Sequence, residues 1–178
     1  MSATSPVEGM GAVSGAPNLP EGFTDTFTSR YIDAGVVRLH AVIGGDGPPL
    51  LLIHGWPQTW YAWRMVMPAL AEAFEVIAVD QRGIGLSVKP KDGYDTATLA
   101  NDVVALMDAL GHQRFALYGT DTGMPIAYAV AADHPDRVNA WLSRRLRFRA
   151  RLPHHRCSSR HSSTPASGTS PSTNCLQR

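Results

Sequence analysis

Cysteine is scarce in this chain and absent from most of it. The 178 residues include two cysteines, Cys157 and Cys175, and both lie near the C-terminal end. The longer preceding part therefore has no thiol for a disulfide framework or a thiolate metal site. We predict no metal and no cofactor. Cysteine usage leaves the cellular compartment open, and we favour the cytoplasm.

Long apolar runs are also missing. No run approaches the roughly 20 residues needed to cross a bilayer. The N-terminus, "MSATSPVEGMGAVSGAPNLPEG", lacks the basic start and the unbroken apolar stretch of a signal peptide. We therefore expect a soluble protein with no membrane partner, in which residues 1–22 form a flexible leader rich in Gly, Pro, Ser and Ala.

Acidic residues are absent from 141–178, which contain eight arginines and carry a net charge of +8. Residues 1–140 hold eight Lys and Arg against all fifteen Asp and Glu, a net charge of −7. An acid-free basic tail is a feature of nucleic-acid-binding proteins. This tail has no helical basic stripe and no regular aromatic interleaving, so we expect any nucleic-acid binding to be weak and salt-sensitive.

Between these ends, strand-like and helix-like patterns alternate. We expect strands at "FTSRYIDAG", "VVRLHAVIGG", "LLLIHG", "FEVIAVD" and "RFALYG". We expect helices in "TWYAWRMVMPALAEAF", interrupted at Pro68, and in "TATLANDVVALMDALGH" and "TGMPIAYAVAADHP". The first two strands should form an antiparallel pair around the turn at Gly35. The alternation predicts an α/β fold with a mostly parallel sheet, helices on both faces and disordered termini.

Three motifs follow three of these strands in order: "HGWP" at 54–57, "DQRGIGLS" at 80–87 and "GTDTG" at 119–123. The last has the shape of a nucleophile elbow, a tight strand-to-helix turn with the reactive residue at its tip. Here the tip is Asp121. An isolated aspartate at such a position is also a common helix N-cap.

In this order the motifs resemble the first half of the α/β-hydrolase fold, in the branch that contains epoxide hydrolases and haloalkane dehalogenases. The resemblance runs from about Phe23 to Val138. It implies three parts for the chain: the leader 1–22, a partial hydrolase domain at 23–140, and a basic tail at 141–178 that is disordered or out of frame.

The resemblance also implies that Asp121 is the nucleophile. A carboxylate suits displacement of a leaving group from saturated carbon, which produces an ester of the enzyme. When water attacks that ester, the backbone N–H groups of Trp56 and Thr122 would stabilise the oxyanion. His54, Gly55 and Pro57 would shape the loop, with a cis bond before Pro57 allowed.

The expected substrate is a small-molecule epoxide. Haloalkane dehalogenases typically place a halide-binding asparagine where Trp56 stands, so an alkyl halide is the alternative. Two residues depart from the family pattern: Thr120 replaces a usual histidine, and Thr122 replaces a frequent tryptophan. A non-catalytic remnant or a binding protein on the same fold also stays open, and the oligomeric state is not indicated.

Several nearby residues have ordinary structural interpretations. A histidine at the end of a buried strand, like His54, more often orders a loop than catalyses. Trp60 and Trp63, three apart in an aromatic segment, are expected to pack rather than to contact substrate. Four residues of the second motif are expected to form a salt-bridged turn beside the site: Asp80, Arg82, Gly83 and Gly85.

The resemblance places a general-base histidine, its acidic partner and two ring-opening tyrosines after the elbow. The tail histidines, His154, His155 and His161, have no strand or helix pattern around them and no acid to orient them. Read in a shifted frame, residues 165–175 permit Arg-Leu-Trp-His-Phe-Ala-Phe-Asn-Gln-Leu, which resembles a cap-helix segment of epoxide hydrolases. We expect a frameshifted or truncated hydrolase that lacks these catalytic groups and is inactive in turnover.

Overall fold

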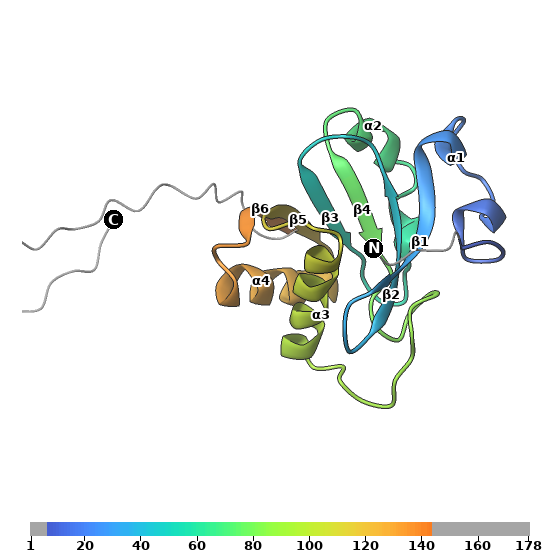
Figure 1. The fold of residues 1–178 in the computed structure, drawn as a ribbon. Helices are drawn as coiled ribbons and strands as arrows, with labels where there is room; N and C mark the ends of the chain where they lie inside the picture. Colours follow the sequence, from blue (N-terminus) through green and yellow to red (C-terminus); the bar gives the residue numbers. More distant parts are fainter. Residues whose placement is uncertain (1–6, 144–178) are drawn as a thin grey trace, which may run out of the picture.

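The computed structural model describes residues 7–143, with side chains through residue 140. Its six strands form one sheet in the order β1-β2-β4-β3-β5-β6, shown in Figure 1. The strands are β1 Phe27–Asp33, β2 Arg38–Gly44, β3 Pro49–Ile53, β4 Glu75–Val79, β5 Phe115–Gly119 and β6 Val138–Ser143. Strand β2 runs antiparallel to both β1 and β4, and the other neighbouring pairs are parallel. The predicted opening hairpin and the mostly parallel sheet are confirmed.

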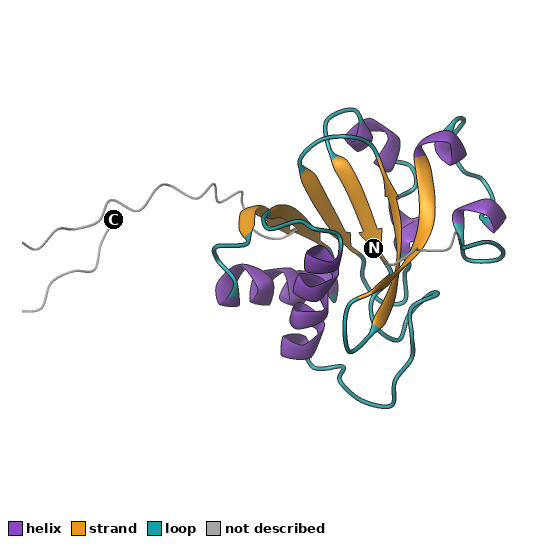
Figure 2. Cartoon of the chain, in the orientation of Figure 1, coloured by secondary structure: helices purple, strands orange, loops and turns teal. Residues whose placement is uncertain are grey.

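Helices connect the strands, as Figure 2 shows. They are α1 Phe23–Thr26, α2 Met67–Ala71, α3 Thr96–Ala109 and α4 Gly123–Asp133, with 3-10 turns η1 Val13–Gly15 and η2 Trp60–Trp63. Helix α3 starts where the side chain of Asp95 accepts a hydrogen bond from Thr98 N (3.0 Å). It ends just before Gly111, whose φ of 87° suits glycine. Pro68 interrupts the preceding segment as predicted, since it lies in the first turn of the separate helix α2.

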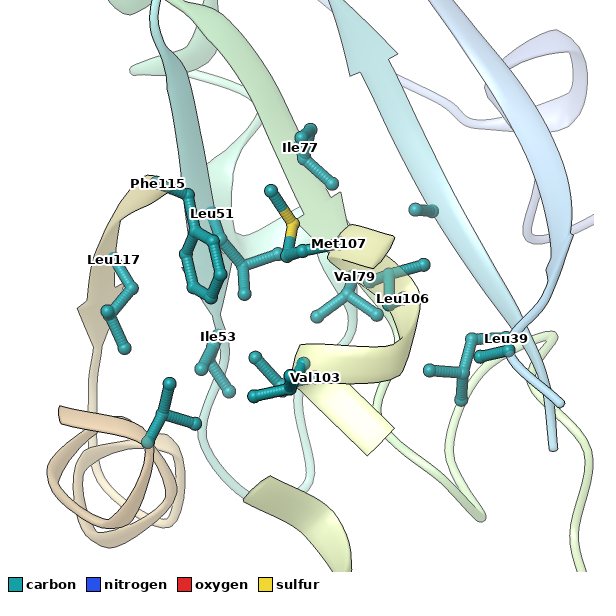
Figure 3. Packing of buried hydrophobic residues seen from close by; sticks show 14 of the residues in the cluster. Leu39, Leu51, Ile53, Ile77, Val79, Val103, Leu106, Met107, Phe115 and Leu117 are labelled. Atoms are coloured by element: carbon teal, nitrogen blue, oxygen red, sulfur yellow. The ribbon is translucent and has the colours of Figure 1, made fainter. Parts of the chain in front are cut away.

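Side chains alternate between the two faces of the sheet and form two cores. Leu51 and Ile53 lie in the core that α3 and α4 cover, seen from close by in Figure 3, whereas Leu52 joins the core on the other face with Trp60 and Met67. An unbroken apolar strand is what burial on both faces requires. Because β3 and β5 are parallel neighbours, their carboxyl ends lie side by side at one edge of the sheet. Both faces of the sheet are covered at this point.

The ends of the domain differ in detail from the expected boundaries. Strand β6 pairs with β5 as far as Ser143, three residues into the segment we assigned to the basic tail. Residues 7–22 pack against the body, and Ala12 is fully buried. Their Gly- and Pro-rich composition did not indicate these contacts, because small residues also suit a tight chain path. The expectations for residues 1–6 and 144–178 lie outside the described residues.

Within residues 7–143, no helix combines the length and the apolar composition of a bilayer span.

Candidate active site

Asp121 lies on a strained turn between β5 and α4. Its φ of 50° places a non-glycine residue in the left-handed region, which costs an L-residue on the order of 1–2 kcal/mol. Thr120 N donates to Ile53 O (3.2 Å), and Gly123 N donates to Thr120 O (2.8 Å). These bonds tie the turn to the end of β3 and leave the Asp121 side chain exposed at the tip.

The two glycines of "GTDTG" are required by close backbone approach. A Cβ on Gly119 would lie 2.3 Å from the carbonyl oxygen of Gly123. A Cβ on Gly123 would lie 2.4 Å from the carbonyl oxygen of Ile53. Both obstacles are backbone atoms, which cannot swing aside as a flexible side chain can. The helix therefore starts directly on top of β3, and this contact fixes the position of Asp121.

The "HGWP" loop packs onto Asp121 from β3. A Cβ on Gly55 would lie 2.5 Å from the Cβ of Asp121. The Trp56–Pro57 bond is cis, as the resemblance allowed. Among the described residues, none accepts a hydrogen bond from the backbone N–H of Trp56 or of Thr122. Thr122 follows Asp121 directly in the sequence. Trp56 lies in the "HGWP" loop that packs against Asp121.

His54 is buried beneath this loop. Its Nδ1 donates to Gly55 O (2.9 Å), and its Nε2 accepts from Gln81 N (3.2 Å). A backbone N–H requires an unprotonated acceptor, so the ring is the neutral tautomer with the proton on Nδ1. Burial lowers the pKa of His54, and the Gly55 carbonyl opposes that effect only in part. Both ring nitrogens are engaged within the protein, so His54 has none to offer a substrate.

The second motif is braced by buried polar contacts. The Asp80 carboxylate accepts from His40 Nδ1 (2.8 Å), Trp60 N (2.8 Å) and Leu86 N (3.1 Å). A Cβ on Gly85 would lie 2.1 Å from an oxygen of this carboxylate. The turn therefore closes around Asp80, and its buried carboxylate is used in contacts within the protein.

Arg82, from the same motif, forms a salt bridge, but its partner lies on α3 and not in the turn of Asp80, Gly83 and Gly85 where we expected the bridge. Its Nε and a terminal nitrogen donate to the two carboxylate oxygens of Asp102 on α3 (2.6 and 2.7 Å). The hydrogen-bonded Asp102 carboxylate raises the pKa of Arg82. Within residues 7–143, no group of three or more His, Cys, Asp or Glu side chains forms a potential metal site.

Asp121 opens onto a cavity of about 940 Å³. The cavity is lined by Gln58, Ala62, Trp63, Tyr118, Thr120, Asp121 and Met124. Trp60 is buried as expected, and Trp63 packs against the same core while also facing the cavity. Trp63 lines the cavity, with its ring edge-to-face on Tyr118 at 5.4 Å.

Gln58 and Tyr118 are cavity residues that the sequence analysis missed. Gln58 Oε1 accepts from Gly55 N (3.2 Å), which ties the amide to the loop that packs against Asp121. Tyr118 precedes the elbow on β5 and projects to the face opposite Leu117. Strand alternation from the elbow would have found Tyr118, and nearness to "HGWP" would have pointed to Gln58.

A mostly parallel sheet in the order β1-β2-β4-β3-β5-β6, with helices on both faces and a tight turn from β5 into α4, has the architecture of the α/β hydrolase fold. Residues 48–143 match the family model described as the alpha/beta hydrolase fold. This match covers more than half of the chain, and the protein belongs to that family.

Two curated relatives and one solved structure are informative. The soluble epoxide hydrolase of Corynebacterium sp. (strain C12) is 50% identical over 101 residues, covering 57% of this chain and 35% of the relative. The fluoroacetate dehalogenase of Burkholderia sp. is 43% identical over 117 residues, covering 63% and 38%. The structure of the epoxide hydrolase CorEH without ligand aligns with a TM-score of 0.64 at 44% identity, covering 66% of this chain and 41% of that one. The chain thus spans well under half the length of these relatives.

Proposed function

We propose that this chain carries the nucleophilic part of an epoxide hydrolase. Asp121 attacks an epoxide carbon and forms an ester with the protein. The observation that carries the proposal is the strained, exposed position of Asp121 at the wall of a cavity. Backbone strain maintained at one polar residue in a cavity is characteristic of functional sites. A helix N-cap role does not account for it, since the N-cap residue of α4 is Thr122 and not Asp121.

The first step is a displacement at carbon. An oxygen of the Asp121 carboxylate forms a bond to a ring carbon, the bond from that carbon to the ring oxygen breaks, and the resulting alkoxide takes up a proton from water. In the second step a base takes a proton from water as the water oxygen attacks the carbonyl of the ester, and the negative charge develops on the former carboxylate oxygen. The backbone N–H groups of Trp56 and Thr122 stabilise that charge. The intermediate then collapses: the bond between the carbonyl carbon and the ester oxygen breaks, that oxygen takes up a proton, the diol leaves and the Asp121 carboxylate is restored. His54, Gly55 and Pro57 hold the loop that carries Trp56.

The second step needs a general base, and the described histidines are occupied elsewhere. His40 pairs with Asp80, His54 lies within its loop, His112 contacts Glu75 and His134 contacts Asn101. None of these four lines the Asp121 cavity. Residues 7–143 therefore supply the alkylation step, and we propose that hydrolysis of the ester depends on a base outside them. His154, His155 and His161 lie outside the described residues.

Displacement of halide is the second candidate, because a carboxylate at the same position can attack a carbon that bears a halogen. The dehalogenase relative favours this candidate. The epoxide is favoured by the higher identity of the epoxide hydrolase relative and by Trp56, which stands where a halide-binding asparagine is typical.

The two candidates are separated by offering both substrates to one protein. Cys157 and Cys175 are changed to Ser in every sample, because free thiols also react with epoxides. The chain is incubated with styrene oxide and, in parallel, with fluoroacetate. We expect intact-mass spectra to show one added epoxide per chain and no fluoride release, and the adduct to be absent in Asp121→Asn. Fluoride release that depends on Asp121, without epoxide addition, would favour the dehalogenase instead.

A further inference from the structure

The N-terminal segment 9–17, which we call the strap, is hydrogen-bonded to the turn η2. The indole Nε1 of Trp60 donates to Gly11 O (2.8 Å), and the hydroxyl of Tyr61 donates to Pro17 O (2.5 Å). Both acceptors are backbone carbonyls of the strap. Two successive residues of η2 are therefore held from the outside of the molecule.

The strap is anchored to the body independently of η2. Val13 N donates to the hydroxyl of Ser29 on β1 (2.9 Å), in a buried position. Ala12 is fully buried, and Val13 lies in the same core as Phe23 of α1 and Phe27 of β1. The strap is therefore fixed to β1 by contacts of its own, and its bonds to η2 connect that turn to β1.

The opposite side of η2 faces the active-site cavity. From within the protein, the carboxylate of Asp80 accepts from Trp60 N (2.8 Å). The next residues of the turn, Ala62 and Trp63, form part of the cavity wall that includes Asp121. A wall element held by the strap on one side and by Asp80 on the other has little freedom to shift.

We propose that the strap positions the cavity wall, with Trp60 and Tyr61 as positioning residues that set where Ala62 and Trp63 lie relative to Asp121. The inference rests on the proposed function for its catalytic meaning, because the cavity is taken as the epoxide site. Loosening the strap should change which epoxides fit beside Asp121. This effect is distinct from a loss of folded protein, which would lower the reaction with all epoxides equally.

The first measurement follows amide hydrogen exchange in the full chain and needs no activity. Trp60→Phe removes the bond to Gly11, and Tyr61→Phe removes the bond to Pro17 while keeping the ring. Each variant should speed exchange at residues 61–66 by about tenfold, the effect expected from one lost hydrogen bond, with α3 unchanged. Tyr94→Phe is the matched control, because it loses a hydroxyl bond to Pro90 O (2.6 Å) away from η2. Unchanged exchange at 61–66 in Tyr61→Phe would overturn the proposal even if Trp60→Phe fails to fold.

The second measurement is the ratio of Asp121 labelling rates by styrene oxide and by propylene oxide. The ratio cancels the folded fraction, so a purely structural role would leave it unchanged. We expect the ratio to shift severalfold in Tyr61→Phe and to stay constant in Tyr94→Phe. Faster exchange with an unchanged ratio would overturn the positioning role. If neither epoxide labels the parent chain, the proposed function fails, and the exchange data alone decide whether the strap holds η2.

Discussion

Asp121 owes its geometry to residues that are distant in the sequence as well as to its neighbours. The pattern "GTDTG" was sufficient to predict a tight turn with the acid at its tip. The contact of Gly55 with the Cβ of Asp121 could not be predicted from spacing, because it depends on β3 and β5 being adjacent and parallel in the sheet. Gln58, by contrast, is bonded to Gly55 only three residues away, so its nearness to "HGWP" was a usable signal.

His54 gives a pH dependence whose sign follows from burial. Because burial lowers its pKa in the folded state, the unfolded chain binds a proton that the folded chain does not. The free energy of unfolding should therefore fall as the pH drops below the ordinary histidine pKa of about 6.5, by at most about 1.4 kcal/mol per pH unit from this residue. Urea unfolding between pH 7.5 and 5, chosen as roughly bracketing that pKa, measures the slope.

The variant His54→Gln isolates this contribution. It should be less stable at pH 7.5, since it disturbs the bonds to Gly55 and Gln81, but its stability should depend less on pH. A slope equal to that of the parent chain would show that His54 does not carry the effect.

At the scale of elements, the contact between α4 and β3 is the part of the site most sensitive to added volume. Gly123→Ala would place a methyl group 2.4 Å from the carbonyl oxygen of Ile53, and overpacking of this kind costs about 1–3 kcal/mol. We expect the start of α4 to move and labelling of Asp121 by an epoxide to be lost. Labelling is measured by mass spectrometry under conditions where circular dichroism shows a folded chain.

Gly111→Ala is the matched control for that variant. Its φ of 87° strains an alanine, at a cost of about 1–2 kcal/mol, but an added Cβ meets nothing within 4 Å. The two variants should thus lose similar stability while Gly111→Ala keeps its labelling. Equal loss of labelling in both would mean that general stability, and not the elbow geometry, limits the reaction.

The elements that could be predicted are those with an unambiguous pattern. "LLLI" is apolar on both faces and forms β3, and the face of α3 that includes Val103 and Leu106 is buried as its spacing indicates. The bonds of the strap to η2 were not predictable, because backbone carbonyls such as those of Gly11 and Pro17 leave no signature in the sequence. The 3-10 form of η2 was also not predicted, because a tryptophan pair spaced by three suits an ordinary helix as well.

At the scale of the whole molecule, the chain is divided between an acidic body and a basic tail. Residues 1–140 carry a net charge of −7 and residues 141–178 a net charge of +8. We predict that the full chain binds duplex DNA weakly at about 50 mM salt and that binding is lost by about 200 mM, as expected when affinity comes from phosphate contacts alone. Fluorescence anisotropy with two unrelated duplexes tests this. Binding that survives high salt or distinguishes the two sequences would contradict the prediction.

The central claim is that Asp121 is a nucleophile that forms an ester at carbon. Its most direct test is peptide mapping of the full chain after incubation with styrene oxide, followed by treatment with hydroxylamine, which cleaves esters and leaves thioethers of Cys157 and Cys175 intact. The account predicts a hydroxylamine-sensitive adduct on Asp121 and on no other described carboxylate. An unmodified Asp121 in a chain labelled elsewhere, or an adduct spread evenly over exposed acids, would contradict it.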